Sequence, residues 1–102
     1  MQSVIQSLKQ NLKVIYRKAV DADNKLKQLQ QAGMGKHNKI FVDDIGFKVE
    51  SRLFLPYVQE LSDDIDSLEK MGEQELNQSL ANVVKKIEQM HLTLVTFDKN
   101  AG

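Results

Sequence analysis

The segment Ile40–Val58, IFVDDIGFKVESRLFLPYV, decides the fold of this chain of 102 residues. It holds three of the four phenylalanines, one of the two tyrosines and the only proline. The segments on either side of it are long and amphipathic with a helical period. The sequence therefore predicts a small all-α bundle that is organised around an aromatic middle segment.

Length and composition set the class of protein. A chain of 102 residues with 41% apolar and 27% charged residues forms one domain and can bury a modest core. It contains no cysteine, which excludes disulfides, thiolate nucleophiles and sulfur-ligated metals. The sequence shows no signal-peptide pattern, and no apolar run approaches the roughly 20 residues that cross a bilayer. We therefore expect a cytoplasmic protein that has no membrane partner.

The net charge of zero conceals a division of charge along the chain. Residues 1–41 carry eight cations and two carboxylates, a balance of +6, whereas residues 42–102 carry six cations and twelve carboxylates, a balance of −6. This asymmetry indicates either a basic element that meets an acidic partner or a basic helix that packs beside an acidic one. We favour the second interpretation, because an antiparallel bundle satisfies it within one chain.

The first predicted helix covers residues 1–31. Its apolar residues are spaced alternately four and three apart, which is the pattern of a coiled-coil seam. The members of this seam are Met1, Ile5, Leu8, Leu12, Ile15, Ala19, Ala22, Leu26 and Leu29. The next segment, residues 32–41, contains two glycines and an asparagine without periodicity, so we predict a flexible loop there.

The second predicted helix covers residues 43–71. Asp43 or Asp44 is its expected N-cap, because a short carboxylate accepts hydrogen bonds from the unpaired N–H groups of the first turn. Two apolar stripes run along it, and their members are Ile45, Val49, Leu53 and Tyr57 in one and Phe47, Phe54, Val58, Leu61, Ile65 and Leu68 in the other. Pro56 lacks an N–H and clashes with the preceding turn, so it either kinks this helix or begins a new one. We expect Gly72 to stop the helix.

The third predicted helix covers residues 73–97. Its seam repeats the four-and-three spacing through Leu76, Leu80, Val83, Ile87, Met90, Leu94 and Phe97. Glu73 and Glu75 stand in its first turn, where carboxylates complement the helix dipole. Three such helices predict an antiparallel up-down-up bundle in a single domain, residues 1–102, with the second helix kinked or split near Pro56.

Candidate catalytic and metal-binding groups are few. Neither His37 nor His91 has a carboxylate or a second histidine three or four residues later, as a helical pair of metal ligands would require. The acidic run of Asp63, Asp64 and Asp66 lacks the central glycine of a calcium loop. We therefore expect no enzymatic activity, no metal site and no cofactor.

Two other surfaces are candidates for binding. Lys9, Lys13 and Arg17 lie four residues apart on one strip of the first predicted helix, beside Tyr16. Such a strip can neutralise phosphates, but the acidic second half of the chain predicts only weak and salt-sensitive affinity for DNA. Some apolar residues lie outside the seams and indicate either a thicker core or a patch that a partner or a second copy covers: Val14, Leu55, Tyr57, Leu92 and Val95.

The run Phe47-Lys48-Val49-Glu50-Ser51-Arg52-Leu53-Phe54 resembles a run in the PriC family of primosomal replication restart proteins. In that family a basic, an apolar and an acidic residue lead to a Leu-Phe pair. The family's run follows a leucine-rich N-terminal helix and begins a long second helix, and a third helix with leucine spacing comes after it. The shared layout covers residues 1–97, and the shared motif consists of Lys48, Val49, Glu50, Leu53 and Phe54.

The resemblance implies an interaction domain of a factor that helps to load the replicative helicase at abandoned forks. It implies as partners the replicative helicase, the single-stranded-DNA-binding protein and, weakly, forked or single-stranded DNA. The partner-binding surface that it implies consists of Phe47, Lys48, Val49, Glu50 and Arg52. Members of the family usually continue into a strongly basic C-terminal region, which this sequence does not contain.

Two further functions are compatible with the same predicted helices. The first is a helical adaptor or secretion-type chaperone that binds a partner helix against exposed apolar stripes. The second is a structural coiled-coil homodimer whose long seams serve self-association. The oligomeric mass separates the homodimer from the other functions, and we expect a monomer rather than a dimer.

Overall fold

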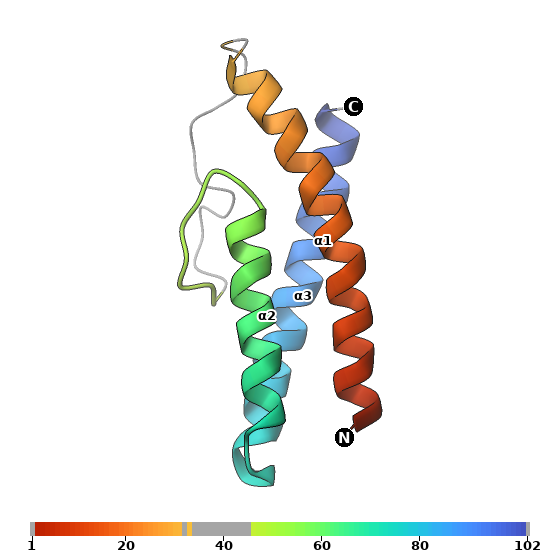
Figure 1. Ribbon diagram of the computed structural model, residues 1–102, viewed down its shortest axis with the longest axis vertical. Helices are drawn as coiled ribbons and strands as arrows, with labels where there is room; N and C mark the ends of the chain where they lie inside the picture. Colours follow the sequence, from red (N-terminus) through yellow and green to blue (C-terminus); the bar gives the residue numbers. More distant parts are fainter. Residues whose placement is uncertain (1, 32, 34–45, 102) are drawn as a thin grey trace.

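The computed structural model describes residues 2–31, 33 and 46–101, which form an all-α bundle (Figure 1). Its helices are α1 (Gln2–Gln31), α2 (Leu55–Glu69) and α3 (Glu73–Ala101). Figure 1 shows α1 and α2 side by side and antiparallel, with α3 behind both of them. Each helix packs against the other two, so the predicted up-down-up three-helix bundle is confirmed.

The core follows the predicted seams. Both long helices bury the residues that are spaced three and four apart, and α2 contributes a complete buried stripe. The buried apolar residues are Ile5, Leu8, Ile15, Ala19, Ala22, Phe54, Tyr57, Val58, Leu61, Ile65, Leu68, Leu76, Val83, Ile87, Met90 and Leu94. Burial of each large aliphatic or aromatic side chain contributes about 1.5–3 kcal/mol relative to exposure, which makes these seams the main source of stability.

The second helix is shorter than predicted. It begins at Leu55 rather than at residue 43, and Pro56 is its second residue. A helix that passed through Pro56 would lose a hydrogen bond, and the proline ring would clash with the carbonyl of Arg52, whereas the first turn has no need of that N–H. The predicted kink and the helix over residues 46–54 are therefore wrong. Pro56 lies in the first turn of a helix, close to the alternative in which it is the first residue, but the helix begins one residue earlier, at Leu55.

The N-terminus of α2 is capped by a side chain from α1. The backbone N–H groups of Phe54 and Leu55 donate to the carboxylate of Asp23 at 2.6 and 3.0 Å. Asp23 is only 2% exposed, and the N-cap residue Phe54 provides no side-chain cap of its own. The buried carboxylate therefore serves the unpaired amides and the positive end of the helix dipole at once. The predicted caps, Asp43 and Asp44, lie outside the described residues.

The C-terminal ends of α2 and α3 differ from the predicted ends by up to one helical turn. α2 ends at Glu69, before the predicted stop, and the carbonyl of Gly72 instead accepts the first hydrogen bond of α3 from the N–H of Leu76 at 3.0 Å. α3 continues past Phe97 to Ala101, because no glycine or proline interrupts those residues. After α1, Gly33 adopts a φ of 71°, the left-handed conformation that ends helices. The rest of the predicted loop, residues 32–41, lies outside the described residues.

Opposite charges on neighbouring helices are paired within the chain. α1 carries six cations and two carboxylates, whereas α2 carries five carboxylates and no cation. Lys9 forms an ion pair with Glu69 of α2, and Lys25 forms one with Asp98 of α3 at 3.3 Å. These contacts support the interpretation that the division of charge is satisfied in part between helices of one molecule.

Candidate functional site

The residues before α2 form an extended segment, here called the strap (residues 46–54), which lies along the side of α2 away from α1 (Figure 1). It begins at Gly46, whose φ of 102° favours glycine. Exposure then alternates with a period of two, as in a strand. Lys48, Glu50 and Arg52 are exposed, and the residues between them are half-buried.

The strap therefore divides the predicted partner-binding residues into two groups. Lys48, Glu50 and Arg52 lie on the outer side. Phe47 and Val49 are half-buried and pack against the core of the bundle. The prediction treated these five residues as one helical surface, whereas in the strap three of them are exposed and two are half-buried and anchor the segment.

Two side chains of α2 hold the strap through its backbone. The carboxylate of Glu60 accepts hydrogen bonds from the N–H groups of Lys48 at 2.9 Å and Val49 at 2.8 Å. The hydroxyl of Tyr57 accepts one from the N–H of Ser51 at 2.9 Å and donates one to the carbonyl of Ser51 at 3.2 Å. These bonds satisfy backbone groups that a helix would have paired internally, so they explain how the strap is stable without regular secondary structure.

A lysine of α3 completes this attachment. Lys86 is only 8% exposed, and its Nζ donates to Glu60 at 2.7 Å and to Asp64 at 2.6 Å. The same Nζ lies 5.0 Å from the centre of the Phe47 ring, within the range of a cation–π contact. The Phe47 ring in turn packs edge-on against Tyr57 at 5.1 Å. These residues, the Lys86 cluster (Lys86, Glu60, Asp64, Phe47), join the strap to two helices.

The pKa values of Lys86 and Glu60 are shifted by the hydrogen bonds between them and their neighbours. Burial alone would lower the pKa of Lys86, but the hydrogen bonds to Asp64 and Glu60 outweigh it and raise this pKa above its ordinary value. Burial alone would raise the pKa of Glu60, but the hydrogen bonds from Lys86 and from the two strap amides hold this pKa below its ordinary value. Both groups are thus kept charged at neutral pH, as a structural ion pair requires.

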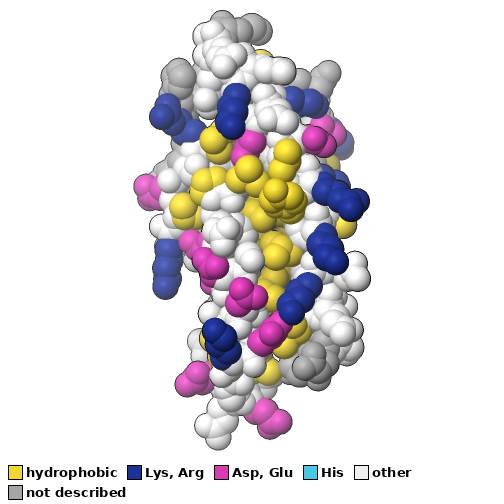
Figure 2. All heavy atoms as spheres, in the orientation of Figure 1, with side chains coloured by type: hydrophobic (Ala, Val, Ile, Leu, Met, Phe, Trp, Pro, Cys, Tyr) yellow, Lys and Arg dark blue, Asp and Glu magenta, His cyan; other side chains and the backbone are white. Residues whose placement is uncertain are grey.

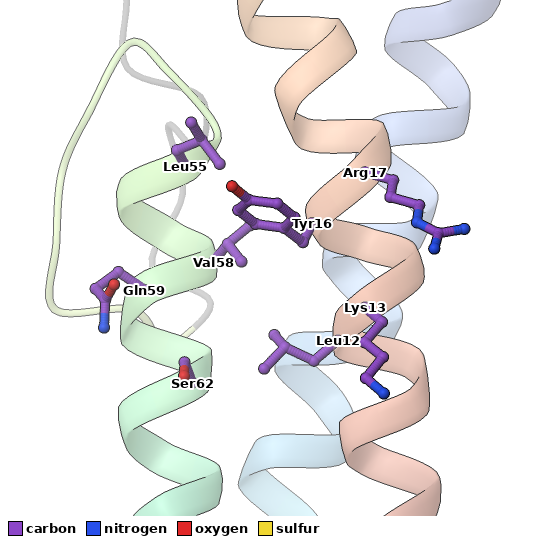
Figure 3. A pocket seen from close by; sticks show the side chains of 8 residues that line it. All are labelled: Leu12, Lys13, Tyr16, Arg17, Leu55, Val58, Gln59 and Ser62. Carbon is purple, nitrogen blue, oxygen red and sulfur yellow. The ribbon is translucent and has the colours of Figure 1, made fainter.

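An open groove lies between α1 and α2, on the face of α2 opposite the strap. This α1–α2 groove has a volume of about 580 Å³ and is lined by Leu12, Lys13, Tyr16, Arg17, Leu55, Val58, Gln59 and Ser62. Figure 3 shows the ring of Tyr16 directed across the groove toward α2, while Lys13 and Arg17 extend away from α2. Tyr16 is 54% exposed although its ring lies beside aliphatic side chains.

The predicted nucleic-acid strip is only partly available. Lys9 is engaged by Glu69 across the lower part of the helix pair. Lys13 and Arg17 border the α1–α2 groove, and no ion pair among the described residues engages either of them. Asp63 and Asp66 of the neighbouring α2 form no ion pair among the described residues, so a phosphate backbone that reached Lys13 and Arg17 would meet their repulsion.

Of the two histidines, His91 joins two helices and does not form part of a metal-binding group of described residues. The Nε2 of His91 lies 3.1 Å from the Oδ1 of Asn11, a contact that joins α3 to α1. Burial and the nearby charge of Lys18 lower the pKa of His91. Within the described ranges, no three histidine or acidic side chains are grouped so that they could hold a metal ion. His37 lies outside those ranges.

The predicted surplus of apolar residues is partly at the surface. Val14, Leu92 and Val95 are exposed, as the sequence suggested. Leu55 is half-buried and Tyr57 is only 1% exposed, so these two belong to the packing of α2 instead. None of the helices in the described part of the chain is long and apolar enough to cross a membrane.

Comparisons with protein-family models, with curated proteins and with solved structures found no match to this chain. The functional argument therefore comes from the residues themselves. Sequence reasoning proposed the outer residues of the strap and the basic strip as binding residues, and it missed Asp23 and Lys86 as structural groups. Nothing in the local pattern marks these two, because their partners are 22 to 32 residues away in the sequence.

Proposed function

We propose that this chain is a non-enzymatic protein-interaction domain of a replication-restart factor of the PriC kind. It helps to load the replicative helicase at abandoned forks through contacts with the helicase and with the single-stranded-DNA-binding protein, in the cytoplasm. The observation that supports this proposal is the strap. Its outer residues Lys48, Glu50 and Arg52 are exposed within the run that carries the resemblance, while its inner residues are anchored.

Anchoring makes the outer edge of the strap suitable for recognition. Lys48, Glu50 and Arg52 present a positive, a negative and a positive charge in this order on the outer side of the strap. Glu60 and Tyr57 already hold the backbone in place, so a partner does not have to order it on binding. Charges at such an exposed edge favour orientation and partner choice more than they favour raw affinity.

DNA is a secondary partner in this proposal. Lys13 and Arg17 provide two cations beside the acidic α2, and Lys9 is already paired. Few phosphates can therefore be neutralised, which makes the expected affinity for forked or single-stranded DNA weak and strongly dependent on salt.

The test is binding of the domain to immobilised replicative helicase and, separately, to immobilised single-stranded-DNA-binding protein. We expect saturable binding that the Lys48→Ala and Arg52→Ala variants weaken, because both side chains are exposed on the strap. Lys18→Ala is the matched control, since Lys18 is an exposed lysine of α1 near His91 of α3. Binding that is unchanged in both strap variants, or absent for both partners with the fold intact, would refute the proposal.

A further inference from the structure

The face that contains the α1–α2 groove has a basic edge and an acidic edge on either side of an apolar strip. Figure 2 shows this strip with a column of Lys and Arg side chains on its α1 side and Asp and Glu side chains on its α2 side. The strip includes Leu12, Tyr16, Leu55 and Val58. It is independent of the strap, which lies on the other side of α2 (Figure 1).

The charged edges can be assigned to particular residues. Lys13 and Arg17 line the groove on the α1 side. On the α2 side, the carboxylate of Asp63 accepts a hydrogen bond at 3.1 Å from Gln59, which lines the groove. Asp66 is exposed and lies four residues after Ser62, which lines the groove, so it lies on the same side of α2 one turn further along.

Such a face is complementary to itself under only one arrangement. A two-fold axis that runs along the helices places α1 of each copy against α2 of the other, so each basic edge meets an acidic edge. A two-fold axis across the helices would place α1 against α1 and α2 against α2, and both contacts would be repulsive. The axis along the helices also keeps every residue at its own height along the bundle.

The heights of the charges match under this symmetry. Lys13 and Ser62 line the same groove, and Asp63 directly follows Ser62, so Lys13 and Asp63 lie at a similar height. In the two-fold arrangement, Lys13 of one copy therefore faces Asp63 of the second copy, and the contact occurs twice. The half-exposed ring of Tyr16 lies between these two contacts, where a second copy can cover it.

We infer that the occupant of the α1–α2 groove is a second copy of this chain, bound about a two-fold axis parallel to the helices. The dimer interface consists of the apolar strip around Tyr16, flanked on both sides by contacts between Lys13 and Asp63 of opposite copies. This inference replaces the expectation of a monomer. A second copy and DNA then compete for Lys13 and Arg17.

Sedimentation of the intact chain over a range of concentrations tests the inference. The wild type should pass from the monomer mass of 11.6 kDa to twice that mass as the concentration rises. Lys13→Glu and Asp63→Lys should each weaken association about tenfold or more, because each change creates two like-charge contacts per dimer. Both side chains are exposed, so the circular dichroism and thermal unfolding of each variant should match the wild type.

The mixture of the two variants provides the decisive measurement. Equimolar Lys13→Glu and Asp63→Lys chains should form a heterodimer about as tightly as the wild type, since both contacts then join opposite charges again. Lys48→Ala changes only the strap and should dimerise like the wild type, which separates this test from that of helicase binding. A wild type that stays monomeric, swaps that leave association unchanged, or a mixture that fails to associate would each overturn the inference.

Discussion

Asp23 lies in the last third of α1 and is almost completely buried, yet its carboxylate forms no ion pair among the described residues. It accepts hydrogen bonds from two backbone amides at the start of α2, those of Phe54 at 2.6 Å and Leu55 at 3.0 Å. Replacing Asp23 by alanine removes both acceptors and leaves one buried and one partly buried amide without a partner. This substitution tests directly whether a side chain of α1 determines where α2 begins.

The size of the effect follows from the two amides. A buried donor that loses its partner costs about 1–3 kcal/mol. The amide of Phe54 is buried and that of Leu55 is partly buried, so we expect Asp23→Ala to reduce the free energy of unfolding by about 2–4 kcal/mol. This loss is large for a domain of this size, whose total stability is on the order of 5–15 kcal/mol.

The Asp23→Asn variant separates the loss of the charge and of one acceptor from the loss of both acceptors. Asp23→Asn keeps one carbonyl oxygen as an acceptor but brings an NH₂ group toward the second amide and removes the charge. It should therefore lose about half as much stability as Asp23→Ala, because a charge-assisted hydrogen bond is about twice as strong as a neutral one. Asp21→Ala is the matched control, since Asp21 is an exposed carboxylate on the same helix.

The assay is urea unfolding followed by far-ultraviolet circular dichroism, together with amide hydrogen exchange. Asp23→Ala should lower the urea midpoint, and the Phe54 and Leu55 amides should lose protection before the rest of α2. Asp21→Ala should stay within about 0.5 kcal/mol of the wild type. Wild-type stability and wild-type protection at both amides in the Asp23→Ala variant would refute the assignment of Asp23 as the cap of α2.

Three other perturbations address the Lys86 cluster and the dependence on pH. Lys86→Met should cost about 3 kcal/mol in urea unfolding, because it leaves the Glu60 and Asp64 carboxylates without their shared cation; a stability equal to that of the wild type would contradict the cluster's structural role. The lowered pKa of His91 means that the unfolded chain binds its proton more tightly, so stability should begin to fall as the pH drops below 6.5, and His91→Gln should flatten that part of the profile. The lowered pKa of Glu60 adds a second loss as the pH drops below 4.5, which Glu60→Gln should remove at the expense of stability at neutral pH.

The two long helices could be predicted because their apolar residues repeat at a helical spacing over seven or more positions. Ile15 and Met90 lie at the centres of the two seams, and both are completely buried. The period of 3.6 residues leaves one stripe per helix for the core, so three helices of this kind have few ways to pack. The sequence also predicted that a basic α1 would pack beside an acidic α2.

The strap was predicted to be helical because its apolar residues fit two kinds of secondary structure. Ile45, Val49, Leu53 and Tyr57 are four residues apart, and such a spacing fits a helical stripe as well as one side of a strand. The charged residues between them alternate strictly, which favours the extended interpretation. The helical interpretation rested on the two apolar stripes and on Asp43 or Asp44 as the expected N-cap, whereas Pro56 delays the helix to Leu55 here.

The contacts that hold the strap could not be predicted from local pattern. Lys86 falls beside the seam of α3, and Asp23 falls beside that of α1, positions where a charged residue is ordinarily exposed. Their burial depends on partners that the fold brings from other helices. The α1–α2 groove was missed for the same reason, because Leu12 and Leu55 are apolar residues that a sequence alone assigns to the core.

The central claim is that the outer edge of the strap is a preformed interaction surface. The most direct measurement is a titration of the isotope-labelled domain with replicative helicase, followed by the amide NMR signals of the described residues. We predict that the signals of Lys48, Glu50 and Arg52 shift or broaden first, while the anchored core keeps its signals. A titration that leaves the strap signals unchanged, or that affects only residues of the α1–α2 groove, would contradict the account.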